Sequence, residues 1–143
     1  MPALRNLTAA VLIALTTGCA TGLDPYQEAE LANYRANNLA VQEKSTALAA
    51  GLGLLPGVGS FYGRAYGYGV ANLLLWPFSM IWDPISGHHA AEFINYQATK
   101  AHITKLKRRE VLMLDNKLDA NEIDLNQYAR EKQKVEEKYS YTL

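Results

Sequence analysis

The sequence predicts a small all-α protein with a central apolar helical hairpin and a C-terminal helical hairpin. No segment shows the strict alternation of apolar and polar residues that is typical of a strand. Two Asp-Pro pairs, Asp24-Pro25 and Asp83-Pro84, have the cap-then-proline pattern that begins helices. Runs without charge lie on both sides of Pro56-Gly57, a pair that breaks a helix. These three observations define the fold class.

The first helix is predicted over residues 25–48. Asp24 can accept hydrogen bonds from free backbone N–H groups, and Gln27 completes a capping box. The stretch is rich in alanine and carries charged residues that suit solvent. We assign residues 19–46 to an N-terminal helical segment.

An apolar, glycine-rich hairpin is predicted over residues 47–86. The segment 57–64 is expected to be a turn or loop, because its glycines permit positive φ angles. A second apolar helix is predicted over residues 66–82, with a kink at Pro77. Residues 65–82 carry no charge and as a helix would be about 27 Å long, which just reaches the thickness of a bilayer core.

Residues 87–143 form a charged helical C-terminal region. A helix over residues 87–116 has a partial apolar stripe, which consists of Ile103, Leu106, Val111 and Leu114. Asp124 and Gln127 form a second capping box and begin a helix that runs to about Lys138. The side chains expected to face inward from this last helix are Leu125, Tyr128, Val135 and Tyr139.

Residues 1–18 have the organisation of a secretory signal peptide. Arg5 supplies the positive start, residues 9–15 are apolar, and Thr17-Gly18 are small. With Cys19, this segment resembles a bacterial lipoprotein signal, in which the cysteine becomes the lipidated first residue. The alternatives are an ordinary signal peptide with an incidental cysteine, or an uncleaved N-terminal helix.

The lipoprotein resemblance implies a protein of the bacterial cell envelope that is anchored to membrane lipid through acylated Cys19 and faces the periplasm. Ala20, which is not acidic, favours the outer membrane over the inner. Cys19 is the only cysteine of the chain, so it cannot be half of an intramolecular disulfide. Several acyl chains, as in mature lipoproteins, hold a protein at a membrane better than one.

The central hairpin resembles the two-transmembrane-helix domain family. The matching residues are Gly57, Gly59, Phe61, Tyr62, Gly69, the apolar run 71–82 and Asp83. The family implies a membrane hairpin and no particular reaction. Two arrangements remain open: a hairpin that spans the bilayer, or one that lies on the membrane or packs within the domain. Spanning would leave the basic cluster after residue 100 in the periplasm, which opposes the positive-inside bias.

The segment 112–138 resembles the short C-terminal oligomerisation domain called SHOCT. The matching residues are Leu114, Leu118, Ile123, Asp124, Tyr128 and Lys132. Asn121 can take the left-handed conformation that the end of the preceding helix requires. The resemblance implies a homo-oligomer or an envelope protein partner. A helical hairpin that is exposed to solvent and has no partner is the alternative.

A basic cluster precedes this segment, and it consists of Lys100, Lys105, Lys107, Arg108 and Arg109. Such a cluster is usually a solvated helix face. Near a membrane it can instead contact anionic lipid headgroups, at about 1 kcal/mol per basic residue. The expected lipid anchor favours that second interpretation.

Composition and motifs argue against several other functions. The whole chain has 14 Lys and Arg against 14 Asp and Glu, so nothing suggests nucleic acid as a partner. Asp115 to Asp124 does not fit a calcium loop, and adjacent His88 and His89 do not make a zinc site. We find no catalytic motif and expect no metal and no cofactor.

The sequence therefore predicts a membrane-anchored envelope lipoprotein without enzymatic activity, with an assembly or interaction role at the membrane. One alternative is an accessory subunit of a larger envelope or secretion complex. Another is a ligand-binding or hydrolytic domain that uses the glycine-rich turn, which lacks a paired nucleophile and base.

Overall fold

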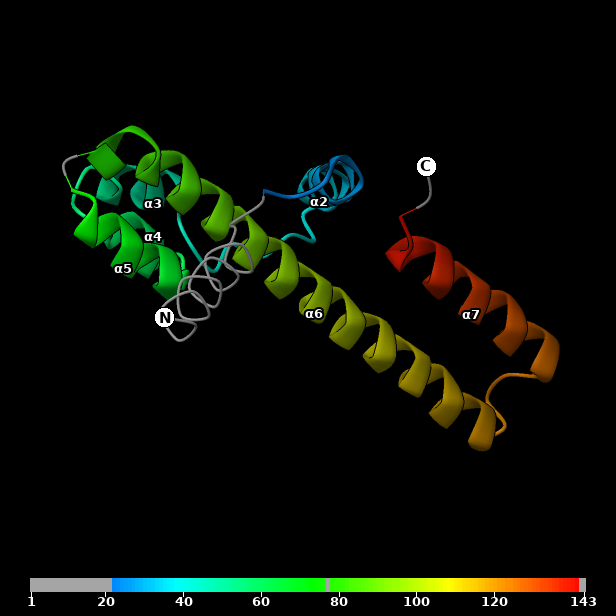
Figure 1. Cartoon of the computed structure of the whole chain (residues 1–143). Coiled ribbons are helices and arrows are strands. Elements are labelled where there is room, and N and C mark those ends of the chain that lie inside the picture. The colour runs from blue at the N-terminus through cyan, green and yellow to red at the C-terminus, as the bar shows by residue number, and fades with distance from the viewer. Residues whose placement is uncertain (1–21, 77, 142–143) are drawn as a thin grey trace, which may run out of the picture. The chain divides into compact units, whose positions relative to one another are not determined.

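The computed structural model describes residues 22–76 and 78–141, and all regular structure in these residues is helical (Figure 1). The prediction of an all-α fold is confirmed. The chain divides into two compact units. Unit 1 contains Gln42–Asn95 and the described residues before Gln27, and unit 2 contains Gln27–Val41 and the described residues from Tyr96 onward. The predicted signal peptide, Cys19 and the kink at Pro77 lie outside the described residues.

The first predicted helix is in fact two helices, α2 (Pro25–Ala36) and α3 (Thr46–Leu52). Helix α2 ends because Asn38 adopts a left-handed conformation with φ 55°, and the N–H of Leu39 turns back to the Tyr34 carbonyl at 2.9 Å. Helix α3 begins where the Ser45 hydroxyl accepts a hydrogen bond from the Leu48 N–H at 3.2 Å. The prediction of one continuous helix was wrong because these two local signals were not recognised.

The glycine-rich segment contains a short helix, α4 (Val58–Tyr62), where the sequence predicted a turn or loop. Gly57 precedes it with φ 72°, so the expected positive φ is present at this one glycine. The loop prediction was wrong for the residues after it. The low helix propensity of glycine is overridden here by close packing of backbones.

The apolar helix predicted over residues 66–82 is divided into α5 (Tyr66–Leu74) and a 3₁₀ helix, η1 (Phe78–Ile81). A residue that precedes proline disfavours the α conformation, so the division falls before Pro77. None of the described helices combines the length and the apolarity that crossing a bilayer requires.

The C-terminal hairpin is formed by α6 (Asp83–Asp119) and α7 (Leu125–Tyr139) (Figure 1). Helix α6 begins earlier and ends later than predicted. Between the helices, Asn121 has φ 57°, as expected of a left-handed helix end. The Asp124 side chain accepts a hydrogen bond from the Gln127 N–H at 2.7 Å, which confirms the predicted cap.

The core of unit 2 lies between α2, α6 and α7. Its buried members are Tyr34, Ile103, Val135 and Tyr139, and the partly buried residues around them include Leu106, Val111 and Leu114. The predicted apolar stripe of α6 is therefore confirmed. Tyr128 is half-buried and donates a hydrogen bond to Asp115 at 2.7 Å. Leu125 is 72% exposed, so its predicted inward position was wrong.

Candidate functional site: an apolar surface over a polar interior

The interior of unit 1 contains a cluster of polar side chains, in addition to the buried apolar residues Leu23, Ala49, Ala90 and Ala91. Ser60 on α4, Asn72 on α5 and Asp83 at the start of α6 are buried, and Asp83 has no exposed area. The Ser60 hydroxyl donates a hydrogen bond to Asp83 Oδ1, and the Asn72 amide donates to the same oxygen at 2.6 Å. Asn72 also reaches Ser60 Oγ, at 3.0 Å. These contacts tie together three segments that are far apart in the sequence.

The indole of Trp82 closes this cluster, because its N–H donates a hydrogen bond to Asn72 Oδ1 at 2.8 Å. Two further buried atoms, Asp83 Oδ2 and Ser79 Oγ, have no hydrogen-bond partner among the described residues. A buried polar atom without a partner is destabilising by about 1–3 kcal/mol. The hydrogen bonds to Asp83 Oδ1 and Asn72 stabilise the unit. The burial of Asp83 Oδ2 and Ser79 Oγ without partners opposes that stabilisation.

Glycines bring the backbones of unit 1 close enough for this cluster to form. A Cβ on Gly57 would lie 2.3 Å from the Gly69 carbonyl oxygen, and one on Gly59 would lie 2.7 Å from Gly53 Cα. A Cβ on Gly87 would lie 2.8 Å from the Ala49 carbonyl oxygen. No larger residue fits at these contacts without movement of the backbone.

The residues of the predicted hairpin motif fall into two groups. Gly57, Gly59 and Asp83 belong to the interior just described. Phe61 covers Gly69, because a Cβ added to Gly69 would lie 2.8 Å from the Phe61 ring. Phe61 itself is 37% exposed. Tyr62 faces the segment before α3: its hydroxyl accepts a hydrogen bond from the Ser45 N–H at 3.2 Å, and the Lys44 ammonium lies 4.4 Å from its ring centroid.

The large apolar side chains of the same segment lie outside. Every one described from Val70 to Ile85 is at least 40% exposed. We call this set the apolar surface, and its members are Val70, Leu73, Leu74, Leu75, Trp76, Phe78, Met80, Ile81, Trp82 and Ile85. They belong to α5, η1, the start of α6 and the turns between these three elements. In this segment the usual burial pattern of a water-soluble protein is reversed. Of the arrangements that the sequence left open, packing of these side chains within the domain does not agree with their exposure.

The basic cluster predicted on α6 is divided by intramolecular contacts. The Lys100 ammonium lies 2.6 Å from the Glu30 carboxylate, and Lys107 pairs with Glu136. Both lysines therefore hold unit 2 together. Lys105, Arg108 and Arg109 are exposed, and they make no ion pair with the described residues.

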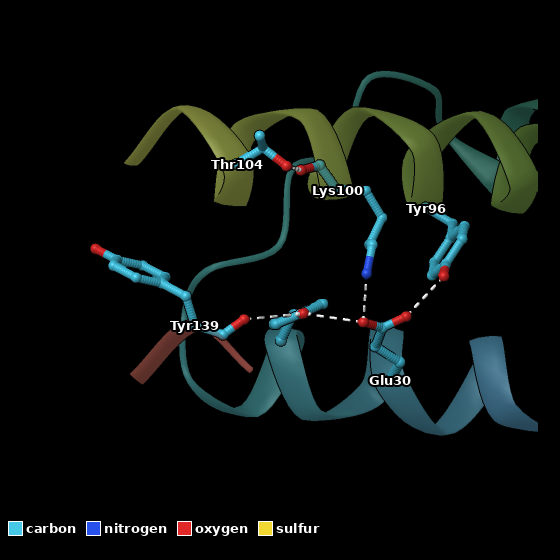
Figure 2. A network of polar contacts seen from close by, with 6 residues as sticks. Glu30, Tyr96, Lys100, Thr104 and Tyr139 are labelled. Carbon is cyan, nitrogen blue, oxygen red and sulfur yellow. Dashed lines mark hydrogen bonds and ion pairs between the residues drawn. The ribbon is translucent and has the colours of Figure 1, made fainter. Parts of the chain in front are cut away.

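Glu30 is the buried charge of unit 2 (Figure 2). Tyr96 donates a hydrogen bond to its carboxylate at 2.6 Å and Tyr34 donates another at 3.0 Å, in addition to the ion pair with Lys100. Burial raises the pKa of Glu30, but the hydrogen bonds and the positive charge of Lys100 outweigh it. The pKa therefore lies below its ordinary value of 4.5.

The described residues offer little to catalysis or metal binding. Within residues 22–76 and 78–141, no three His, Cys, Asp or Glu side chains are grouped so that they could hold a metal ion. His88 lies 3.8 Å from Glu92 and next to His89. Ser60 contacts a carboxylate and the Asn72 amide, it makes no hydrogen bond to a histidine among the described residues, and its side chain is fully buried. This arrangement resembles a packing contact more than an activated nucleophile.

Sequence reasoning missed Asn72, Ser79 and Glu30. The first two are isolated polar residues inside a run without charge, and that isolation is the signal that could have revealed them. Glu30 could not be distinguished from other acidic residues of α2, because its burial depends on contacts with Tyr96 and Lys100, which are distant in the sequence.

Comparisons of the chain with protein families, with curated proteins and with solved structures gave no match. The resemblances to lipoprotein signals, to the two-transmembrane-helix family and to SHOCT therefore stay predictions from short motifs.

Proposed function

We propose that this protein is a non-enzymatic lipoprotein of the bacterial cell envelope, anchored through acylated Cys19, whose unit 1 inserts its apolar surface into the membrane. The observation that supports this proposal most directly is the reversed burial of unit 1. Leu74 and Ile81 are 79% and 77% exposed, whereas Asn72 and Asp83 are buried. An exposed apolar set of this size is typical of a membrane or protein contact.

Lipid is the occupant that the chemistry of unit 1 favours. In lipid, polar groups must find partners within the protein. Ser60, Asn72 and Asp83 Oδ1 do so, whereas Asp83 Oδ2 and Ser79 Oγ have no partner among the described residues. Helices in lipid pack through small residues, as the glycine contacts of unit 1 do. Trp76 and Trp82 suit the boundary between lipid and water. Because no described helix is both long enough and apolar enough to cross, insertion into one leaflet is the arrangement we propose.

The expected acyl anchor would precede the residues of unit 1 in the chain. Gly22 belongs to unit 1 and packs on His89, since a Cβ added to it would lie 3.0 Å from the imidazole. Gly22 is three positions after Cys19 in the sequence, and such a length of chain reaches at most about 10 Å. Stable membrane attachment requires two signals. Acyl chains and the apolar surface would supply these two signals.

Fractionation of cells that express the wild type or Cys19→Ala tests this proposal. We expect the wild type to stay in the membrane fraction through a carbonate wash. The variant should remain partly membrane-bound through the wash, because the apolar surface inserts without the anchor. Separation of the inner from the outer membrane on a density gradient gives the location. Release of the wild type by carbonate would contradict both anchor and insertion, and a fully soluble variant would contradict insertion alone.

The alternative role, as an accessory subunit of a larger envelope complex, is favoured by the exposed leucine at the start of α7. Leu125 is 72% exposed, and it lies in the segment that resembles an oligomerisation domain, so it is available for contact with another chain. Cross-linking in intact membranes, followed by mass spectrometry, separates a homo-oligomer from a complex with another envelope protein. A Leu125→Asn variant should lose the cross-linked species if this residue is part of the contact.

A further inference from the structure

One face of α6 in unit 2 is exposed, and it carries basic and apolar residues. Lys105, Arg108, Arg109 and Leu112 are spaced three or four residues apart and therefore share a face. All four are exposed. Leu112 is 57% exposed and the adjacent Met113 is 46% exposed. We call these five residues the basic strip.

The charges of the basic strip are not neutralised by unit 2. Lys107 and Lys138, on the packed side, pair with Glu136 and Glu110. Glu110, the acidic residue of α6 nearest to Arg109 in sequence, also accepts a hydrogen bond from Tyr139 at 2.7 Å. Arg109 also interacts electrostatically with Glu110, whereas Lys105 and Arg108 make no ion pair with the described residues. The three cations therefore present a local positive charge in a chain whose formal net charge is +0.

We propose that the basic strip docks on anionic phospholipid headgroups, with Leu112 and Met113 inserted between them. Cations around exposed apolar side chains are the composition of helices that lie in a membrane interface. A symmetric contact between two copies through this strip would bring like charges together, which argues against a second copy as the occupant. This inference rests on the proposed membrane location, and it adds lipid selectivity to it.

The size of the effect follows from the number of cations. At the usual contribution of one basic residue near an anionic surface, three residues strengthen binding by roughly 100-fold. Salt should weaken this part of the binding, because exposed charges are screened. The apolar surface of unit 1 carries no charge between Val70 and Trp82, so binding through it should respond little to salt.

Vesicle flotation of the full chain with Cys19→Ala separates the two contributions. Vesicles of phosphatidylcholine alone report on insertion of unit 1, and vesicles that also contain phosphatidylglycerol report on the basic strip. We expect tighter binding to the second kind, and a loss of that preference, by roughly 100-fold, in Lys105→Gln/Arg108→Gln/Arg109→Gln. Leu112→Ser should weaken binding to phosphatidylglycerol vesicles several-fold while the salt dependence remains.

The matched control removes three exposed cations outside the strip: Lys117→Gln/Arg130→Gln/Lys132→Gln. We expect it to keep most of the preference for anionic vesicles. Equal losses in both triple variants would overturn the proposal, because they would show a response to net charge alone. If the strip variant kept the full preference for vesicles that contain phosphatidylglycerol, the proposal would also be overturned. The same holds if the strip bound an acidic protein and the full chain showed no preference among lipids. Failure to float with phosphatidylcholine vesicles would instead count against insertion of unit 1.

Discussion

Ser60 on α4 and Asp83 at the start of α6 are joined by a hydrogen bond in the interior of unit 1, and neither side chain reaches solvent. The two residues are 23 positions apart in the sequence. Their contact fixes α4 against the first turn of α6, while Asn72 joins α5 to the same carboxylate oxygen. The apolar side chains between them are thereby left on the outside.

Replacement of the two buried serines should have opposite effects. Ser60→Ala removes a donor to a buried carboxylate, so we expect it to lower the free energy of unfolding by about 1.5–3 kcal/mol. Ser79→Ala removes a buried hydroxyl without a partner among the described residues, so it should be neutral or stabilising. Urea unfolding in detergent, followed by circular dichroism, measures both. Equal destabilisation would show that the Ser60–Asp83 contact has no special role.

Glycine substitutions should likewise differ in sign. Gly57→Ala forces a Cβ towards the Gly69 carbonyl at a φ of 72°, and we expect a destabilisation of about 2 kcal/mol or more. Gly51→Ala lies within α3 and meets no atom within 4 Å, so helix propensity should stabilise it by about 0.5–1 kcal/mol. The melting temperatures of the two variants give the comparison. If Gly57→Ala were as stable as the wild type, the close approach to Gly69 would be disproved.

Exposure of the apolar surface predicts that polar substitutions there spare the fold. Leu74→Asn/Ile81→Asn should leave the helical circular dichroism spectrum unchanged, because both side chains are largely exposed. In the Cys19→Ala background the same substitutions should reduce the carbonate-resistant fraction several-fold. Leu48→Asn, at an exposed leucine of α3 that is not part of the apolar surface, is the control and should have little effect. Loss of helical signal in the double variant would indicate that these side chains are packed.

Glu30 should make unit 2 sensitive to acid. Because its pKa in the folded protein is below 4.5, its stabilising contribution is complete above that pH and is lost as the pH falls through the lowered pKa. Glu30→Gln should lower stability at pH 7 by about 1–3 kcal/mol and should flatten the acid limb of a plot of melting temperature against pH. Glu28→Gln, at an exposed position of the same helix, should do neither.

Elements that depend on local signals could be predicted from the sequence. The cap at Asp124 and the apolar stripe of α6 were predicted correctly, because a cap and a helical period involve residues that are close in the chain. The separation of α2 from α3 near Asn38 and that of α5 from η1 before Pro77 also have local causes. They were not predicted, because the alanine content of the first segment and the hydrophobicity of the second favoured one continuous helix in each. The left-handed conformation of Asn38 and the Ser45 cap were the signals that could have separated α2 from α3.

The sequence by itself determined that the protein is helical, where α2, α5 and α7 begin, and that residues 65–82 carry no charge. Only the tertiary structure decided which side of that region faces inward. A run with few polar residues has no polar face that periodicity could detect. The inward side is set by contacts between distant residues: Asn72 with Asp83, Gly57 with Gly69, and Gly59 with Gly53. In the same way, only the pairing of Lys100 with Glu30 and of Lys107 with Glu136 reduced the predicted basic cluster to three open cations.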